Sequence, residues 1–195
     1  MKLFVTGGAG TLGSALIHHW HSKFEKIVVL DNLATGDFHK LDGLENVEII
    51  EGSLENQELV EQIIKKNLPD LIINSAASYK TPDDWESDFG TNAMGAVALI
   101  RALADHPEIR LVNFQTALCF GRPNVIPIPA DHPVQPFTSY GISKVAGEQV
   151  LLANHENTVS LRIANVTGPG LAIGPIPAFY KRLKAGEAIT VTDGV

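Results

Sequence analysis

The sequence lacks the features on which several classes of protein depend. Its 195 residues include a single cysteine, Cys119, so no disulfide can form within the chain and a reducing compartment is expected. It has no apolar stretch long enough for a signal peptide or a membrane span. A surplus of basic residues is also missing, since the formal net charge is -7. We therefore expect a cytoplasmic protein with no nucleic-acid and no membrane partner.

The sequence is also poor in clustered metal ligands. His18 and His21 are three residues apart on an expected helix, but no carboxylate or cysteine nearby completes a ligand set. We expect these histidines on a solvated helix surface and no metal site. Cys119 lies in an apolar stretch and is expected to be a buried packing residue.

Apolar runs of strand length alternate along the chain with longer stretches of helical pattern. Such continuous apolar strands predict an α/β fold with a doubly wound parallel sheet that is buried on both faces. The expected strands are Lys2–Thr6, Ile27–Asp31, Val47–Glu51, Leu71–Asn74, Leu111–Gln115 and Val159–Ile163. The expected helices are Thr11–Lys23, Glu55–Lys66, Thr91–Asp105 and Thr138–Ala153. The stretches Gly121–Pro136 and Gly168–Pro177 are rich in proline and glycine and are expected as loops.

A glycine-rich turn joins the first expected strand to the first expected helix. Gly7, Gly10 and Gly13 recur every three residues, and glycine permits both a tight turn and close approach of backbone N–H groups to a phosphate. Asp31 ends the second strand, where its carboxylate would accept hydrogen bonds from a ribose and repel a 2′-phosphate. The pattern predicts a dinucleotide site that prefers NAD to NADP; the alternative is an ordinary strand-to-helix turn.

A tyrosine and a lysine lie four residues apart in the last expected helix. This spacing places Tyr140 and Lys144 on one helix face, where the cation would lower the pKa of the phenol and favour its use as a base. Thr116 follows the fifth strand, where its hydroxyl could hydrogen-bond a reacting oxygen. A Tyr/Lys pair alone is usually inert, but beside a dinucleotide loop it predicts hydride transfer.

Seven segments, in order along nearly the whole chain, carry a family resemblance. They are Thr6–Gly13, Leu30–Asn32, Asn74–Ala77, Asn92–Gly95, Phe114–Gly121, Tyr140–Lys144 and Arg162–Pro169. With them the chain resembles the extended short-chain dehydrogenase/reductase family, in particular nucleotide-sugar epimerases and dehydratases such as UDP-glucose 4-epimerase. The resemblance implies a Rossmann-type fold, NAD as cofactor and a nucleotide-sugar substrate. It also implies a role in polysaccharide biosynthesis and a homodimer joined by the Thr91–Asp105 and Tyr140 helices.

The resemblance further implies roles for single residues. Tyr140 would be the catalytic acid/base, Lys144 would hold the nicotinamide ribose, and Thr116 would bond the sugar hydroxyl that is oxidised. Asn165 would contact the substrate. Tyr140, Lys144 and a further set of residues would contact NAD, namely Gly7, Gly10, Thr11, Leu12, Gly13, Asp31, Asn32, Ser53, Leu54, Ala76, Ala77 and Asn92.

The chain departs from the family pattern at several positions. Dehydratases carry Asp-Glu directly after the catalytic threonine, whereas this chain has Ala117 and Leu118, which have no proton to move. This favours a 4-epimerase that acts through a 4-keto sugar, with an NAD(H)-dependent carbonyl reductase as the alternative enzyme. Ser53 stands where the family usually has an aspartate near the adenine.

The chain is also shorter than the family pattern. We expect residues 1–165 to form the NAD-binding domain with the catalytic residues, and residues 166–195 to be only the beginning of a C-terminal substrate lobe. On this reading the chain is a fragment or a truncated product. A non-catalytic NAD-binding module is therefore a third hypothesis.

Overall fold

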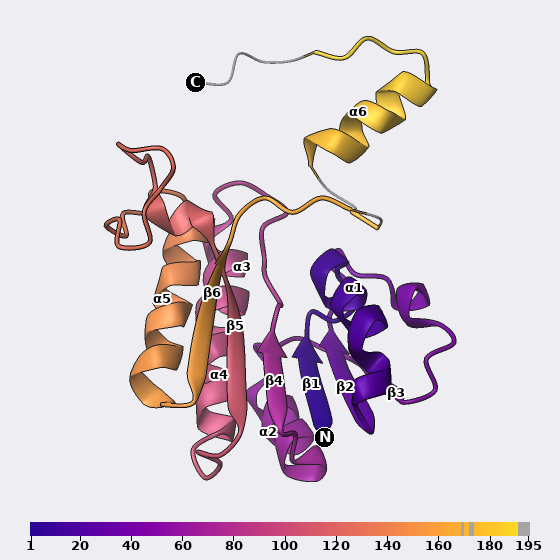
Figure 1. Ribbon diagram of the computed structural model, residues 1–195, viewed down its shortest axis with the longest axis vertical. Coiled ribbons are helices and arrows are strands. Elements are labelled where there is room, and N and C mark those ends of the chain that lie inside the picture. Colours follow the sequence, from indigo (N-terminus) through magenta and orange to yellow (C-terminus); the bar gives the residue numbers. More distant parts are fainter. Residues whose placement is uncertain (169, 172–173, 191–195) are drawn as a thin grey trace.

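The computed structural model describes residues 1–168, 170–171 and 174–190 of the chain. Its centre is a six-stranded parallel sheet in the order β3-β2-β1-β4-β5-β6 (Figure 1). The strands are β1 (Lys2–Thr6), β2 (Lys26–Asp31), β3 (Val47–Glu51), β4 (Leu71–Asn74), β5 (Arg110–Thr116) and β6 (Thr158–Ile163). This order is that of a Rossmann fold, so the predicted fold class is confirmed. Strands β1, β3 and β4 have the predicted bounds, and the other three extend one residue further at one or both ends.

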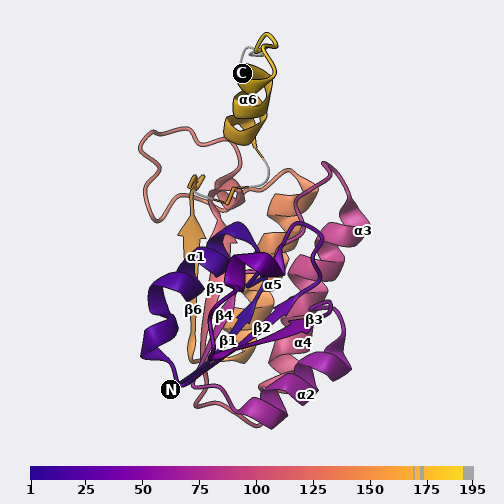
Figure 2. The same ribbon diagram turned by 90° about the vertical axis from the view of Figure 1, so that its right-hand side faces the viewer.

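Helices cover both faces of the sheet (Figure 2). One face carries α1 (Thr11–Trp20) and the short 3-10 helices His21–Lys23 and Phe38–Leu41. The other face carries most of the helical residues, in α2 (Gln57–Asn67), α3 (Trp85–Asp88), a π-helical turn (Phe89–Met94), α4 (Gly95–Ala102) and α5 (Ser139–Asn154). The sheet is therefore the middle layer of three.

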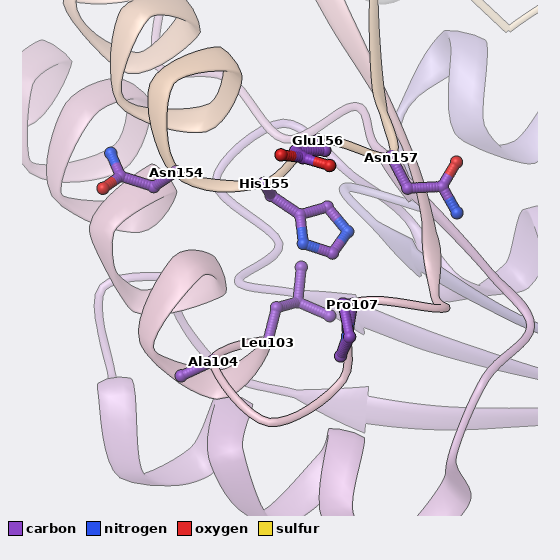
Figure 3. A pocket seen from close by; sticks show the side chains of 7 residues that line it. All are labelled: Leu103, Ala104, Pro107, Asn154, His155, Glu156 and Asn157. Carbon is purple, nitrogen blue, oxygen red and sulfur yellow. The ribbon is translucent and has the colours of Figure 1, made fainter.

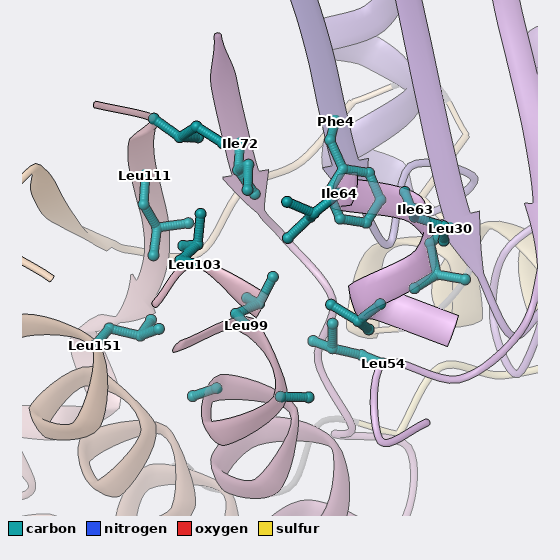
Figure 4. Close-up of a cluster of buried hydrophobic side chains, with 14 of the residues drawn as sticks. Phe4, Leu30, Leu54, Ile63, Ile64, Ile72, Leu99, Leu103, Leu111 and Leu151 are labelled. Carbon is teal, nitrogen blue, oxygen red and sulfur yellow. The ribbon is translucent and has the colours of Figure 1, made fainter. Parts of the chain in front are cut away.

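Two hydrophobic clusters, one on each face, hold these layers together. The alternation along β1 divides its side chains between them, because Phe4 points to one face and Leu3 and Val5 point to the other. Figure 4 shows the larger cluster, where Phe4 lies among Ile64 and other aliphatic side chains from α2, α4 and the strands. Each fully buried side chain of this kind contributes about 1.5–3 kcal/mol.

Capping residues fix where the helices begin. The Asn56 side chain accepts a hydrogen bond from the Leu59 N–H at 3.1 Å, and the Thr138 side chain accepts one from the Gly141 N–H at 3.1 Å. As a result α2 begins two residues later than predicted and α5 begins one residue later, because an N-cap stands outside the helix that it caps. The helix predicted from Thr11 to Lys23 is α-helical only as far as Trp20 and ends in a 3-10 turn.

The helix predicted over Thr91–Asp105 differs most from the structure. Helical conformation begins six residues earlier, at Trp85, because the Asp84 side chain accepts a hydrogen bond from the Ser87 N–H at 3.2 Å. It then passes through the π-helical turn and ends at Ala102. The predicted single α-helix was therefore wrong in both its bounds and its regularity.

The C-terminal part of the chain contains one further helix, α6 (Pro175–Lys184). The loop predicted over Gly168–Pro177 is wrong at its end, since proline is well suited to the first turn of a helix; residues 169 and 172–173 of that loop lie outside the described residues. Figures 1 and 2 show α6 standing off the carboxyl edge of the sheet. None of the helices in the described ranges is long and apolar enough to cross a membrane.

Candidate functional site

The glycine loop lies at the carboxyl edge of the sheet, between β1 and α1. Gly7 has a positive φ of 67°, and its N–H donates to the Leu30 oxygen at 2.8 Å. A Cβ atom at Gly7 would lie 2.7 Å from the Ala76 backbone, so this turn and the chain after β4 are packed backbone against backbone. At the N-terminus of α1, Gly10 provides no side-chain cap. The first N–H groups of the helix therefore remain available to an anion.

Asp31 is buried at the end of β2 and holds the glycine loop in place. Its two carboxylate oxygens accept hydrogen bonds from the N–H groups of Ala9 and Leu33, both at 2.9 Å. A carboxylate has about four lone-pair sites, so these bonds leave room for further donors. The adjacent Asn32 is exposed, with its side chain accepting from the Ala34 N–H at 3.1 Å. The structure thus gives Asp31 a second task, holding the loop, which the motif alone did not indicate.

The three predicted catalytic residues lie together beside this loop. Thr116 is the last residue of β5, and its side chain lies near enough to Tyr140, at the start of α5, to lower the pKa of the phenol. Lys144 lies one helical turn beyond Tyr140 and is only 5% exposed. The exposed ring of Tyr79 packs edge-on against that of Tyr140, with 6.3 Å between centroids. The arrangement places a phenol, a hydroxyl and an amine where one ligand can reach the first two.

Burial sets the ionisation of this pair of residues. It raises the pKa of Tyr140 to about 12, although the nearby Thr116 side chain acts in the opposite direction. It also lowers the pKa of the Lys144 amine to about 8, which the Glu148 carboxylate partly offsets. The prediction that the lysine lowers the pKa of the tyrosine is therefore wrong for the protein alone. Tyr140 holds its proton at neutral pH in this structure.

Two buried amides attach α5 to its surroundings. Gln115 donates from Nε2 to the Lys144 carbonyl oxygen at 3.0 Å and so joins β5 to the helix. The Asn92 amide donates to Ser143 Oγ at 3.0 Å and exchanges hydrogen bonds with the backbone of Ser78. Asn92, predicted to contact the cofactor, therefore has its side chain engaged within the protein. It fixes the chain after β4 against α5.

A buried carboxylate supports the first turn of α5. Ser139 Oγ donates to Asp88 Oδ2 at 2.6 Å, and both residues are 1% exposed. Within the described chain the second oxygen of Asp88 is buried without a hydrogen-bond partner. Motif reasoning missed both residues, because Asp88 stands 51 positions from Ser139 in the sequence.

The remaining predicted residues lie around the same edge. Ser53 and Leu54 follow β3, Ala77 follows β4, and Leu12 lies in the first turn of α1. Asn165 is exposed just beyond the end of β6. Thr11 donates a hydrogen bond to the Gly170 oxygen at 3.2 Å, which brings the segment after β6 over the N-terminus of α1.

A surface hollow lies elsewhere. It has a volume of about 510 Å³ and is lined by residues between α4 and β5 and between α5 and β6 (Figure 3). These connections lie at the amino-terminal edge of the sheet, opposite the residues above, and the ring of His155 is bonded to the Ile109 oxygen at 2.7 Å. The hollow is therefore separate from the candidate site. The described residues also contain no group of three or more histidine, cysteine or acidic side chains arranged to hold a metal ion.

Comparison with known sequences decides the family. The sequence profile of the NAD dependent epimerase/dehydratase family matches residues 3–194. The chain belongs to this family. A curated member that it resembles is a putative UDP-glucose 4-epimerase of Methanocaldococcus jannaschii. The two are 28% identical over an alignment of 205 positions, which covers 98% of this chain and 66% of that protein.

Several solved structures superpose well on this chain. The enzyme WbmG of Bordetella bronchiseptica, crystallised with NAD, is 51% identical, with a TM-score of 0.90 over 97% of this chain and 61% of that enzyme. The same enzyme has been crystallised with NAD and UDP. The UDP-glucose 4-epimerase of Thermotoga maritima, with UDP-glucose, is 27% identical, with a TM-score of 0.89 over 100% of this chain and 67% of that enzyme. The chain spans between about half and two thirds of the length of its curated relatives, at 52% and 66% for two of them.

Proposed function

We propose that this chain carries the NAD-binding domain and the acid/base site of a nucleotide-sugar 4-epimerase. The observation that supports this most is that Thr116 and Tyr140 lie near each other beside the glycine loop, with Lys144 one turn further along α5. The residues present fit the cofactor. The uncapped N-terminus of α1 suits a pyrophosphate, and the carboxylate of Asp31 suits a ribose with free hydroxyls.

In the proposed reaction Tyr140 accepts the proton of the sugar's 4-hydroxyl and later returns it. Thr116 holds the same oxygen by a hydrogen bond. Bound NAD supplies reversible hydride acceptance and a positive ring whose charge lowers the pKa of the phenol. Lys144 holds the nicotinamide ribose and adds its own charge beside the tyrosine. If the 4-keto sugar rotates within the site and is reduced from its other face, the product is the epimer. No NAD is consumed.

The residues after Thr116 favour epimerisation over loss of water. Ala117 is half-buried and Leu118 is 51% exposed, at positions where elimination would need groups that transfer protons. Neither side chain can donate or accept a proton. A dehydratase activity is therefore not proposed, and the alternative enzyme is a reductase that uses the same tyrosine and consumes NADH.

A product assay tests the proposal. The purified chain is incubated with NAD and a panel of UDP-, dTDP- and GDP-sugars, and products are separated by chromatography with mass detection. We expect an isomer of unchanged mass. An oxidised product with formation of NADH, which is the reductase reaction run in reverse, would establish the reductase instead. No product from any sugar, with NAD binding intact by calorimetry, would mean that this chain alone is a cofactor-binding module.

Cofactor choice gives a separate prediction at Asp31. The Asp31→Asn variant removes the charge that repels a 2′-phosphate, so the ratio of the NADP and NAD dissociation constants should fall by roughly ten-fold or more. Titration calorimetry with both cofactors measures this ratio. Asp105→Asn, which removes the same charge from an exposed site beyond α4, serves as the control. An unchanged ratio in Asp31→Asn would show that this carboxylate does not select the cofactor.

The proposal includes a homodimer formed through α4 and α5. Much of the apolar surface of α4 is covered by α2 and α5 of the same chain, since Ala96, Ala98 and Leu99 are buried. Met94 remains 55% exposed and Leu152 remains 49% exposed. We expect light scattering at micromolar concentration to give twice the chain mass, and Met94→Glu to shift it toward the monomer. A monomer mass for the unmodified chain would contradict the dimer.

A further inference from the structure

A row of polar side chains crosses the interior of the sheet. Thr6, Asn74 and Asn113 are level with one another on β1, β4 and β5, and Ser160 continues the row on β6. Thr6 donates to Asn74 at 2.8 Å, Asn74 donates to Asn113 at 3.0 Å, and Asn113 donates to Ser160 at 3.1 Å. Ser160 then donates to Glu148 Oε1 at 2.6 Å. We call this row the polar ladder.

Every hydrogen bond in the polar ladder points the same way. The row begins at the Ala76 N–H, which donates to Thr6 Oγ1 at 3.3 Å, and it ends on the carboxylate of Glu148. Aligned hydrogen bonds polarise one another, and each dipole here has its positive end toward the carboxylate. The ladder therefore directs its last donor at the carboxylate of Glu148, which is only 6% exposed. Four strands contribute side chains to this row.

The position of Glu148 on α5 indicates which residue its carboxylate acts on. It lies four residues after Lys144 on α5, where side chains are neighbours on one helix face, and both residues are buried. On its other side Arg162 of β6 lies 3.8 Å from Glu148 Oε2. The titratable and charged groups around this point are Tyr140 and Lys144 on α5, Arg162 on β6, Cys119 after β5 and Asp88 on α3.

Resting on the proposed function, we propose that Glu148, which the polar ladder fixes one helical turn after Lys144 on α5, is a positioning residue for that lysine. A buried lysine tends to lose its proton, because burial disfavours the charged form. A fixed carboxylate one turn away opposes that loss. The starting point of the ladder, at Ala76 in the chain next to Gly7, ties this support to the expected cofactor loop.

The test measures the ionisation of Lys144 without cofactor or substrate. Protein labelled with 13C at lysine Cε is titrated by NMR, with Lys144→Arg to assign the signal. The pKa of Lys144 is about 8 in the unmodified protein. In Glu148→Gln we expect a titration midpoint lower by at least roughly half a pH unit, since an opposite charge has been removed. Glu148→Asp should restore most of the difference.

Two further variants keep the test decisive. Glu156→Gln removes an exposed carboxylate just after α5 and should leave the Lys144 midpoint unchanged. Ser160→Ala removes the last donor of the polar ladder but keeps both charges, so it should move the midpoint in the same direction if Glu148→Gln does not fold. A change in stability to urea with no movement of the midpoint in any variant would overturn the proposal. Because no sugar or NAD is present, failure of the epimerase assay would leave this result standing.

Discussion

Tyr140→Phe should lower kcat by roughly 10²–10⁴-fold while the dissociation constant for NAD changes only a few-fold. The substitution removes the hydroxyl that lies near Thr116 and, in the proposed reaction, carries the proton. It keeps the aromatic ring, which packs against Tyr79, so the first turn of α5 should be preserved. Steady-state kinetics on the sugar identified by the product assay, with calorimetry for NAD, separates the two effects.

The matched control for this change is Tyr180→Phe. Tyr180 is 58% exposed on α6, where Lys184 lies over its ring. We expect kcat within a few-fold of the unmodified protein. Turnover that survives in Tyr140→Phe would assign the proton transfer to another group, and a comparable loss in both variants would indicate a general effect of removing a phenol.

Gly13→Ala should be among the most damaging single-methyl changes in the chain. The new Cβ would lie 2.4 Å from the Gly7 oxygen and 2.7 Å from Gly8 Cα, which are backbone atoms of the glycine loop and cannot rotate away. Overpacking of this kind costs roughly 1–3 kcal/mol, so the free energy of unfolding should fall by about that amount. NAD affinity should fall as well, because the loop must open to admit the methyl group.

Urea denaturation and NAD calorimetry measure both effects. Gly168→Ala is the control, because a Cβ there meets open space and its φ is not positive, so no loss of stability is expected. If Gly13→Ala retained full stability and full NAD affinity, the close contact between α1 and the first turn would not constrain the loop as described.

The features that were predictable from sequence are those set by short-range patterns. Strands β1, β3 and β4 were placed to the residue, because each is a run of apolar and β-branched side chains bounded by turn residues. The spacing of Gly7, Gly10 and Gly13 identified the loop, because it too is a short-range pattern in the sequence. Cys119 was expected to be buried and is 0% exposed, as its apolar neighbours indicated.

Features that depend on tertiary placement were missed. The raised pKa of Tyr140 follows from burial, which i,i+4 spacing on a helix cannot reveal. Helix α3 begins early because of one cap, at Asp84. The π-helical turn that follows it has no periodic signal in the sequence. The polar ladder needs the register of four strands. The sequence does show a polar residue in each of these strands. Which of those polar residues become neighbours depends on the order and register of the strands in the sheet.

The strand order also has a consequence for the newly made chain. Thr6 is 0% exposed in the finished fold, yet its partner Asn74 is made 68 residues later. At synthesis rates of about 5–20 residues per second, that interval is roughly 3–14 s. Throughout it the first strand can pair only with its neighbour on one side, while the other edge and the threonine hydroxyl stay hydrated. The first strand therefore stays paired on one side only until β4 has been made, and it gains its second neighbour before β4 and β5 gain theirs.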